Sequence, residues 1–184
     1  FQIIRKYTYK HNYYKNYTAQ LQNIKNYWIN TNNENDVKND KSKSDKSYEK
    51  TSGFGHEEWL LDNSKIYKGY HYGFLQPMNV KSGIHIGETY DIHLFTISPQ
   101  KQRIYIGCLH NAIGLSPIEC KEVYGYYKKN GWDKQMEEDI RYVDGIVNDL
   151  KPQEMFNVKF KFEDAKLYIS NPLILKNENI TKHY

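Results

Sequence analysis

The apolar and polar positions of the chain recur with two different periods, and these periods predict a series of short strands and helices. Residues 2–9 alternate as a short strand does, and residues 66–75 form a longer aromatic run that also favours a strand. Residues 14–28 differ, because their apolar positions are spaced by three and four residues, which predicts an amphipathic helix. That helical stripe consists of Tyr14, Tyr17, Leu21, Ile24 and Trp28.

The second half of the chain carries clearer alternation. Residues 90–97 and 103–109 predict the two strands of a β-hairpin, joined by the polar turn at residues 98–101. Residues 156–162 place Phe or Val at every second position and polar residues between them. This pattern predicts a strand with one buried aromatic face and one polar face.

Two helices are predicted between these strands. The sequence Ser-Pro-Ile-Glu at residues 116–119 combines an N-cap serine, a proline at the first helical position and a glutamate that completes a capping box. The Asn-Gly pair at residues 130–131 ends that helix. A second helix is predicted over residues 134–150, ended by Pro152. The fold class is therefore α+β, with a curved, mainly antiparallel sheet and helices at its side.

The length of 184 residues suits a single domain, and we predict one domain over residues 1–184. Residues 32–52 are polar and read as a loop insertion. The chain begins with Phe1 rather than Met, which suggests a piece of a larger protein. Its two cysteines, Cys108 and Cys120, form no CxxC motif, and no apolar stretch could span a membrane. We expect a reducing, cytoplasmic setting.

Tyrosine content and charge bear on the class of partner. The 18 tyrosines can serve as core, as interface or as stacking platforms, although a composition rich in Asn, Lys and Ile also raises the Tyr count in products of AT-rich genomes. The net charge of +4 permits contact with a polyanion without requiring it.

The most informative stretch is residues 53–62, Gly-Phe-Gly-His-Glu-Glu-Trp-Leu-Leu-Asp, which leads into the aromatic run of residues 67–74. Two glycines allow a tight turn and close approach to a ligand, and the following aromatic and polar side chains suit a pocket for a flat ring. The alternative is a turn before a strand, with Trp59 in the core.

Enzymatic motifs are weak. The chain has no Gly-rich phosphate loop and no Gly-x-Ser-x-Gly elbow. Cys108 and His110 are the best pair for a metal, but no second pair completes a site. The Asp-x-Lys sequence at residues 164–166 matches a shortened nuclease motif, which we interpret as chance because its upstream partner would fall on a helix. We expect no catalytic residues, no metal and no cofactor in this chain.

Several segments resemble a known group. The order strand, helix, Trp-Ile-Asn-Thr at residues 28–31, then a hairpin with Arg-Ile-Tyr-Ile-Gly at residues 103–107, resembles the YTH and EVE group of PUA-like domains. Residues 53–62, 130–132 and 156–160 also look like N-terminal modules of modification-dependent (type IV) restriction proteins. Those modules precede an HNH nuclease or a McrB-type GTPase.

The resemblance implies a reader that flips a methylated base of double-stranded DNA into an aromatic cage. The candidate pocket residues are Trp28, Asn30, His56, Glu57, Trp59 and Tyr72. The candidate phosphate contacts are Lys101, Arg103, Lys159 and Lys161. For each residue a structural role stays open: core packing for the aromatics, capping or turn formation for Asn30, His56 and Glu57, and a solvated face for the cations.

Other functions remain open at this point. A methylated-RNA reader would use the same fold, and a protein–protein interaction domain would use the tyrosines as an interface. The sequence does not decide between N6-methyladenine and 5-methylcytosine or its hydroxymethyl form. An asparagine in the cage suits a purine edge, which favours methyladenine.

Overall fold

One long strand, β6 (Arg103–Gly114), organises the sheet. Along one edge it pairs with β5 (Thr89–Ile97), and along the other it meets β9, β8 and β7 in succession. A computed structural model describes this part of the protein, namely residues 3–5, 15–20, 59–79, 83–97, 103–142, 146–147, 151–168 and 173–175.

The sheet has nine strands within these described residues, in the order β1-β2-β5-β6-β7-β4-β3, with β8 and β9 on β6. All neighbours are antiparallel except β2 and β5, which run parallel. The remaining strands are β1 (Ile3–Arg5), β2 (Lys15–Gln20), β3 (Ile66–Tyr67), β4 (Tyr70–Gly73), β7 (Val158–Phe160), β8 (Ala165–Leu167) and β9 (Leu173–Leu175).

The sheet curls because β5 and β6 shift register twice, between Tyr90 and Ile92 and between Leu94 and Phe95. Such bulges bend a strand and increase its twist. At the end of β6 the turn at residues 83–88 packs directly on Gly114, where a Cβ would lie 1.9 Å from the carbonyl oxygen of His85. The α+β class and the curled, mainly antiparallel sheet are confirmed.

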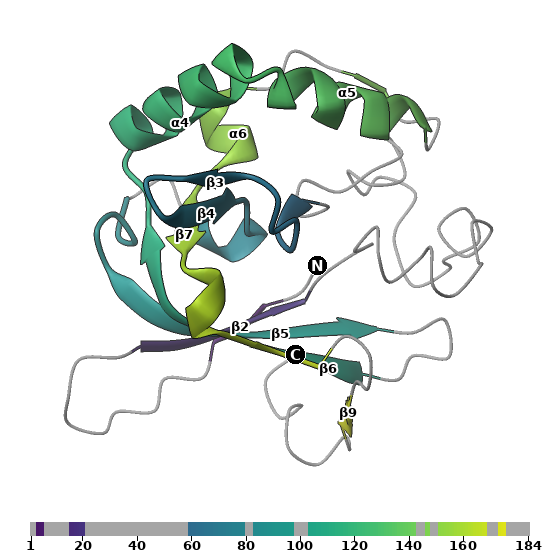
Figure 1. The fold of residues 1–184 in the computed structure, drawn as a ribbon. Helices are drawn as coiled ribbons and strands as arrows, with labels where there is room; N and C mark the ends of the chain where they lie inside the picture. Colours follow the sequence, from purple (N-terminus) through teal and green to yellow (C-terminus); the bar gives the residue numbers. More distant parts are fainter. Residues whose placement is uncertain are drawn as a thin grey trace.

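The helices lie together at one side of the sheet (Figure 1). Helix α4 (Pro117–Lys129) begins with the predicted capping box: the Ser116 hydroxyl accepts from the Glu119 amide, and the Glu119 carboxylate accepts from the Ser116 amide. It ends at Asn130, as predicted. Helix α5 (Trp132–Tyr142), the short α6 (Pro152–Met155) and the 3₁₀ turns η2 (Gln76–Met78) and η3 (Phe162–Asp164) complete the described elements.

Two apolar clusters hold these layers together. The sheet cluster lies on the inner face of β5, β6 and β7 and includes Tyr90, Leu94, Ile106 and Phe160. The helix cluster lies between α4, α5, α6 and β4, and it consists of Trp59, Tyr72, Leu115, Cys120, Val123, Tyr127, Met136, Ile140, Met155 and Phe156.

Two predicted elements near the N-terminal half differ from the structure. Residues 15–20 form strand β2 rather than part of the predicted helix over residues 14–28, because they pair on both sides, with β1 and with β5. The predicted strand over residues 66–75 is a hairpin. Lys68 and Gly69 both have positive φ (50° and 78°), the conformation of a two-residue hairpin turn.

Two boundaries in the C-terminal half also differ. Helix α5 ends at Tyr142 and residues 146–147 are not helical, so the helix predicted to residue 150 is too long. The Asp-Gly pair at residues 144–145 is the stop signal that the prediction passed over. Pro152 begins α6 instead of ending α5. The strand predicted over residues 156–162 is shorter, with regular pairing confined to β7.

Asn157 is the clearest departure from the predicted alternation. The alternation predicts a polar face for Asn157, yet only 9% of it is exposed. Its side-chain amide accepts from the Leu75 amide (2.8 Å) and donates to the Leu75 carbonyl (2.9 Å). The side chain thus replaces a strand pairing, so its burial leaves both of these backbone groups satisfied.

Candidate nucleic-acid interface

Strands β4 and β7 bring several of the predicted site residues together. Their antiparallel register places Tyr72 directly opposite Lys159, with His71 opposite Phe160. Lys161 follows β7 by one residue. The predicted pocket residue Tyr72 and the predicted phosphate contacts Lys159 and Lys161 therefore belong to one region, although they lie about ninety residues apart in the sequence.

Trp59 and Tyr72 are buried in the core of this region and do not lie on its surface. They are only 8% and 5% exposed, and both belong to the helix cluster. The indole nitrogen of Trp59 donates to a carboxylate oxygen of Asp139 at 3.1 Å. Burial raises the pKa of Tyr72 to about 12. This placement favours the core alternative for the two side chains over an open cage wall.

Two neighbouring tyrosines are accessible instead. The Tyr70 ring has the ammonium group of Lys159 at 5.4 Å and that of Lys161 at 5.9 Å from its centroid. The Tyr67 ring stacks on Tyr126 of α4 at a centroid distance of 4.1 Å. We call this region the Tyr–Lys surface, defined by Tyr67, Lys68, Tyr70, Tyr126, Lys159 and Lys161.

The hairpin turn between β3 and β4 fixes the position of Tyr67. Its hydroxyl donates to a carboxylate oxygen of Glu122 at 2.8 Å, and the ammonium group of Lys68 donates to the same oxygen at 2.5 Å. The hydrogen bond from Lys68 holds the pKa of Glu122 below its usual value. Sequence reasoning missed Tyr67 and Tyr126; the Lys-Gly pair at residues 68–69 was the available signal for the hairpin.

Each lysine of the Tyr–Lys surface has an acidic partner. Lys159 donates to Glu119 at 2.8 Å, and Lys161 lies 3.5 Å from Glu163. Glu119 is therefore shared between Lys159 and the capping box of α4. Burial acts to raise the pKa of Glu119, but the hydrogen bonds from Lys159 and Ser116 outweigh it and lower the pKa.

These ion pairs orient the lysine side chains but leave them able to bind another anion. Surface ion pairs contribute about 0–1 kcal/mol, so a lysine can exchange a glutamate for a phosphate at small cost. The result is a surface of partly exposed aromatic rings flanked by cations, which can stack on planar groups and contact anions.

The other predicted site residues cannot be placed. Trp28, Asn30, His56, Glu57 and Lys101 lie outside the described residues. Arg103 begins strand β6, but its side chain also lies outside what the structure describes.

No match to this chain is found among protein-family models, curated proteins or solved structures.

In the described part of the chain, no group of three or more His, Cys, Asp or Glu side chains could hold a metal ion. Cys108 and His110 both lie on β6, with 3.8 Å between the sulfur and Nδ1. Burial raises the pKa of Cys108 to about 12, which leaves the group a thiol rather than a thiolate ligand.

Among the described helices, none has the length and apolar character needed to cross a membrane.

Proposed function

We propose that this chain is a PUA-like, YTH/EVE-type module that binds double-stranded DNA carrying a methylated base. The observation that carries the proposal is the accessible Tyr70 ring with two lysine ammonium groups within 6 Å of its centroid. Aromatic faces with adjacent cations contact both parts of a nucleotide, the base and the phosphate. The sequence resemblance to modified-base readers supports the same reading.

The energetics of base flipping are consistent with such a module. Extruding one base from a duplex costs a few kcal/mol. Stacking on aromatic side chains returns about 1–3 kcal/mol per base. A methyl group that fills an apolar notch adds about 1 kcal/mol. The methyl contribution is thus large enough to decide between modified and unmodified DNA.

The proposal divides the work between two sets of residues. Trp28, Asn30, His56 and Glu57 remain the proposed pocket. The Tyr–Lys surface contacts the phosphates and any unstacked neighbour of the flipped base. Trp59 has a structural role in this proposal. It is buried in the helix cluster and so anchors the segment that follows His56 and Glu57.

In a restriction system such a module supplies recognition only. We propose that cleavage or GTP hydrolysis belongs to a covalently linked HNH nuclease or McrB-type GTPase, and that this chain contributes no catalytic residue. The weak enzymatic motifs of the sequence support this assignment.

A second candidate is favoured by one feature of the site. The three lysines of the Tyr–Lys surface are matched by Glu119, Glu122 and Glu163, so its local charge is balanced. A balanced, tyrosine-rich surface also suits a protein partner. Salt separates the two: phosphate contacts weaken steeply as salt rises, whereas a charge-balanced protein interface does so less.

The test is a fluorescence-anisotropy titration with matched duplexes that carry adenine, N6-methyladenine, cytosine, 5-methylcytosine or 5-hydroxymethylcytosine. We expect one modified duplex to bind about tenfold more tightly, a difference of 1.4 kcal/mol. Equal binding to all duplexes would reject modified-base recognition, and no binding at low salt would favour the protein partner. A methylated RNA of the same sequence tests the RNA-reader alternative.

Variants locate the site in the same assay. Trp28→Ala should remove the preference for the modified duplex, and Lys161→Gln should weaken all duplexes alike. The matched control is Lys134→Gln, which removes an exposed lysine of α5 outside the Tyr–Lys surface. Trp59→Ala is unsuitable here, because removing a core side chain would impair folding and binding together.

A further inference from the structure

The outer face of the β5–β6–β8 sheet carries a second group of aromatic and polar side chains. Ile92, Leu94, Ile106 and Leu109 of these strands belong to the sheet cluster on the inner face. Alternation along the strands leaves their neighbours on the opposite face. We call this group the outer-face cluster, defined by Asp91, His93, Tyr105, His110, Lys166 and Tyr168.

Gly107 allows β8 to join this face. Its φ is 147°, and a Cβ at this position would lie 2.2 Å from the carbonyl oxygen of Lys166. Strand β8 therefore pairs closely with β6 at a position that has no side chain, with Gly107 opposite Leu167. One residue after β8, the amide of Tyr168 donates to the Ile106 carbonyl at 2.7 Å.

This pairing brings two tyrosine rings side by side. Tyr105 and Tyr168 have their ring centroids 6.0 Å apart and tilted by 38°. Both are half-buried, and the exposed Lys166 places its ammonium group 5.9 Å from the Tyr168 ring. The arrangement offers two partly buried aromatic rings with a cation at their edge.

Hydrogen bonds hold the polar members in place. His93 Nδ1 shares a hydrogen bond of 2.8 Å with the Tyr105 hydroxyl. His110 Nδ1 lies 3.1 Å from Asp91, and the His110 side chain is 44% exposed. These groups donate and accept, as the edge of a nucleobase requires.

We propose that the outer-face cluster binds single-stranded nucleic acid, with a base stacked on Tyr105 and Tyr168 and Lys166 on a phosphate. Sheet-borne aromatics act in this way in modules that bind unpaired strands. The cluster needs neither a modified base nor a flipped one, so the proposal goes beyond the modified-base function and stands without it.

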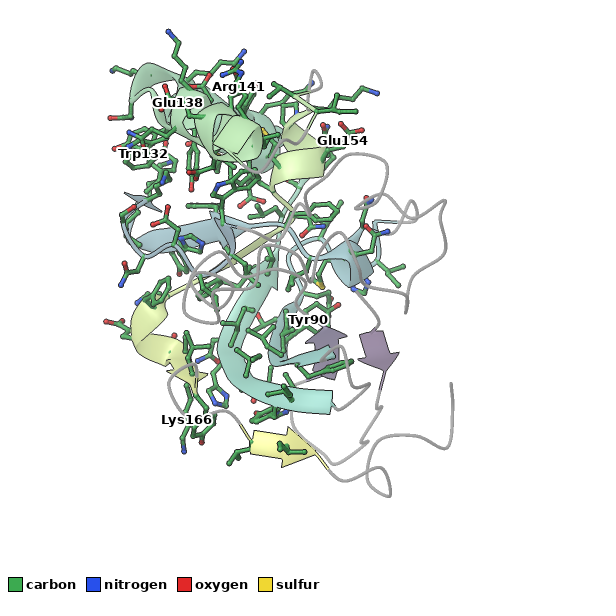
Figure 2. All side chains as sticks on the ribbon, turned by 90° about the vertical axis from the view of Figure 1, so that its right-hand side faces the viewer. Tyr90, Trp132, Glu138, Arg141, Glu154 and Lys166 are labelled. Atoms are coloured by element: carbon green, nitrogen blue, oxygen red, sulfur yellow. The ribbon has the colours of Figure 1, made fainter. Side chains whose placement is uncertain are left out.

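The outer-face cluster is separate from the Tyr–Lys surface. In Figure 2, Lys166 lies in the lower part of the view, well below Trp132, whose ring contacts Tyr126 of the Tyr–Lys surface. A single assay can therefore assign binding to one surface or the other by substitution.

The experiment titrates a short, fluorescein-labelled oligothymidylate, unmodified and single-stranded, with the full chain at low salt. Tyr168→Ala should weaken binding about tenfold, as expected for the loss of one stacked base. Tyr105→Ala removes the other ring of the pair and should weaken binding as well. Lys166→Gln should weaken binding and lower the salt dependence by about one phosphate contact.

The matched control is Lys134→Gln, an exposed lysine of α5 outside both surfaces, which should leave oligothymidylate binding unchanged. The proposal is overturned if the wild type does not bind, if Tyr168→Ala and Lys166→Gln both bind normally, or if Tyr70→Ala on the Tyr–Lys surface weakens binding as much as Tyr168→Ala does. Circular dichroism of each variant checks folding, and the exposed Lys166 gives a substitution that the fold should tolerate. Because the probe is unmodified, this result is independent of the duplex titration.

Discussion

Trp59 and Tyr72 differ from Tyr67 and Tyr70 in a way that side-chain type does not explain. The first pair is buried in the helix cluster, whereas the second pair lies on the Tyr–Lys surface of the same small hairpin region. Tyr70 and Tyr72 are only two residues apart on one strand. Their environments differ because Tyr72 lies within the helix cluster, whereas Tyr70 is only partly buried against it and is bordered by Lys159 and Lys161. Position relative to the helices, not aromatic character, decides which ring is available to a ligand.

The largest effect should come from the buried side. Trp59→Ala removes a core indole and leaves the Asp139 carboxylate without that donor, so we expect the free energy of unfolding to fall by about 3–5 kcal/mol. Urea denaturation followed by circular dichroism measures this loss. Tyr67→Ala is the partly exposed counterpart and should cost about 1 kcal/mol or less. A loss below 1 kcal/mol for Trp59→Ala would contradict its assignment to the core.

A second buried group makes stability depend on pH. His71 is 1% exposed, and its ring meets Phe160 and Phe162 edge-on at 5.1 and 5.5 Å. Burial lowers its pKa from 6.5 to about 4, against a smaller opposing effect of Asp62. The folded protein therefore favours neutral His71, and this contribution is present in full above the unfolded pKa and lost as pH falls through the folded one.

The expected loss between about pH 6.5 and pH 4 is roughly 3 kcal/mol, since each unit of pKa corresponds to 1.36 kcal/mol. Urea denaturation across this range measures it. The pKa of Asp62 is also lowered, because hydrogen bonds from Lys65 and Ser64 outweigh its burial, and it adds a loss at lower pH. His71→Leu should flatten the profile above pH 4. An unchanged profile in that variant would show that another group carries the dependence.

The exposed side should affect binding and not folding. Tyr70→Ala should weaken binding to a modified duplex about tenfold, or 1.4 kcal/mol, through loss of one aromatic contact. Its free energy of unfolding should change by less than 1 kcal/mol. Anisotropy and urea denaturation together measure this contrast with Trp59. A stability loss as large as that of Trp59→Ala would remove the distinction between the two regions.

The smallest effect should come from Lys161. Its side chain is 44% exposed and its pairing with Glu163 is loose, at 3.5 Å. Lys161→Gln should weaken all duplexes by less than 1 kcal/mol at moderate salt and reduce the slope of log K against log salt by about one. Titrations at several salt concentrations measure the slope. An unchanged slope would mean that Lys161 contacts no phosphate.

Local signals in the sequence predicted the elements that depend on local chemistry. The capping box at Ser116 and Glu119 and the stop at Asn130 gave the bounds of α4 within one residue. The alternation of residues 90–97 and 103–109 gave the β5–β6 hairpin, because each strand buries one face. The coarse fold class followed from these elements.

Features that depend on distant partners were not predictable in this way. Residues 15–20 carry a helical spacing but pair as a strand between β1 and β5, so tertiary pairing overrides their period. Asn157 looked like a surface residue because the sequence does not show the backbone of Leu75, which it binds. The burial of Trp59 follows from α5, some eighty residues away, and the Tyr–Lys surface from the pairing of β4 with β7.

Strand β6 has one further consequence, which concerns distance. It carries Tyr105 of the outer-face cluster near its beginning, and near its end Ile113 pairs with Lys159 of the Tyr–Lys surface. The eight residue steps between these points span at most about 26 Å at 3.3 Å per residue. Because one continuous, paired strand sets this separation, the distance between the two surfaces is fixed. A nucleic acid that touches both must reach across that fixed interval, so the length of its unpaired segment, rather than its base sequence, would select which ligands engage the two surfaces at once.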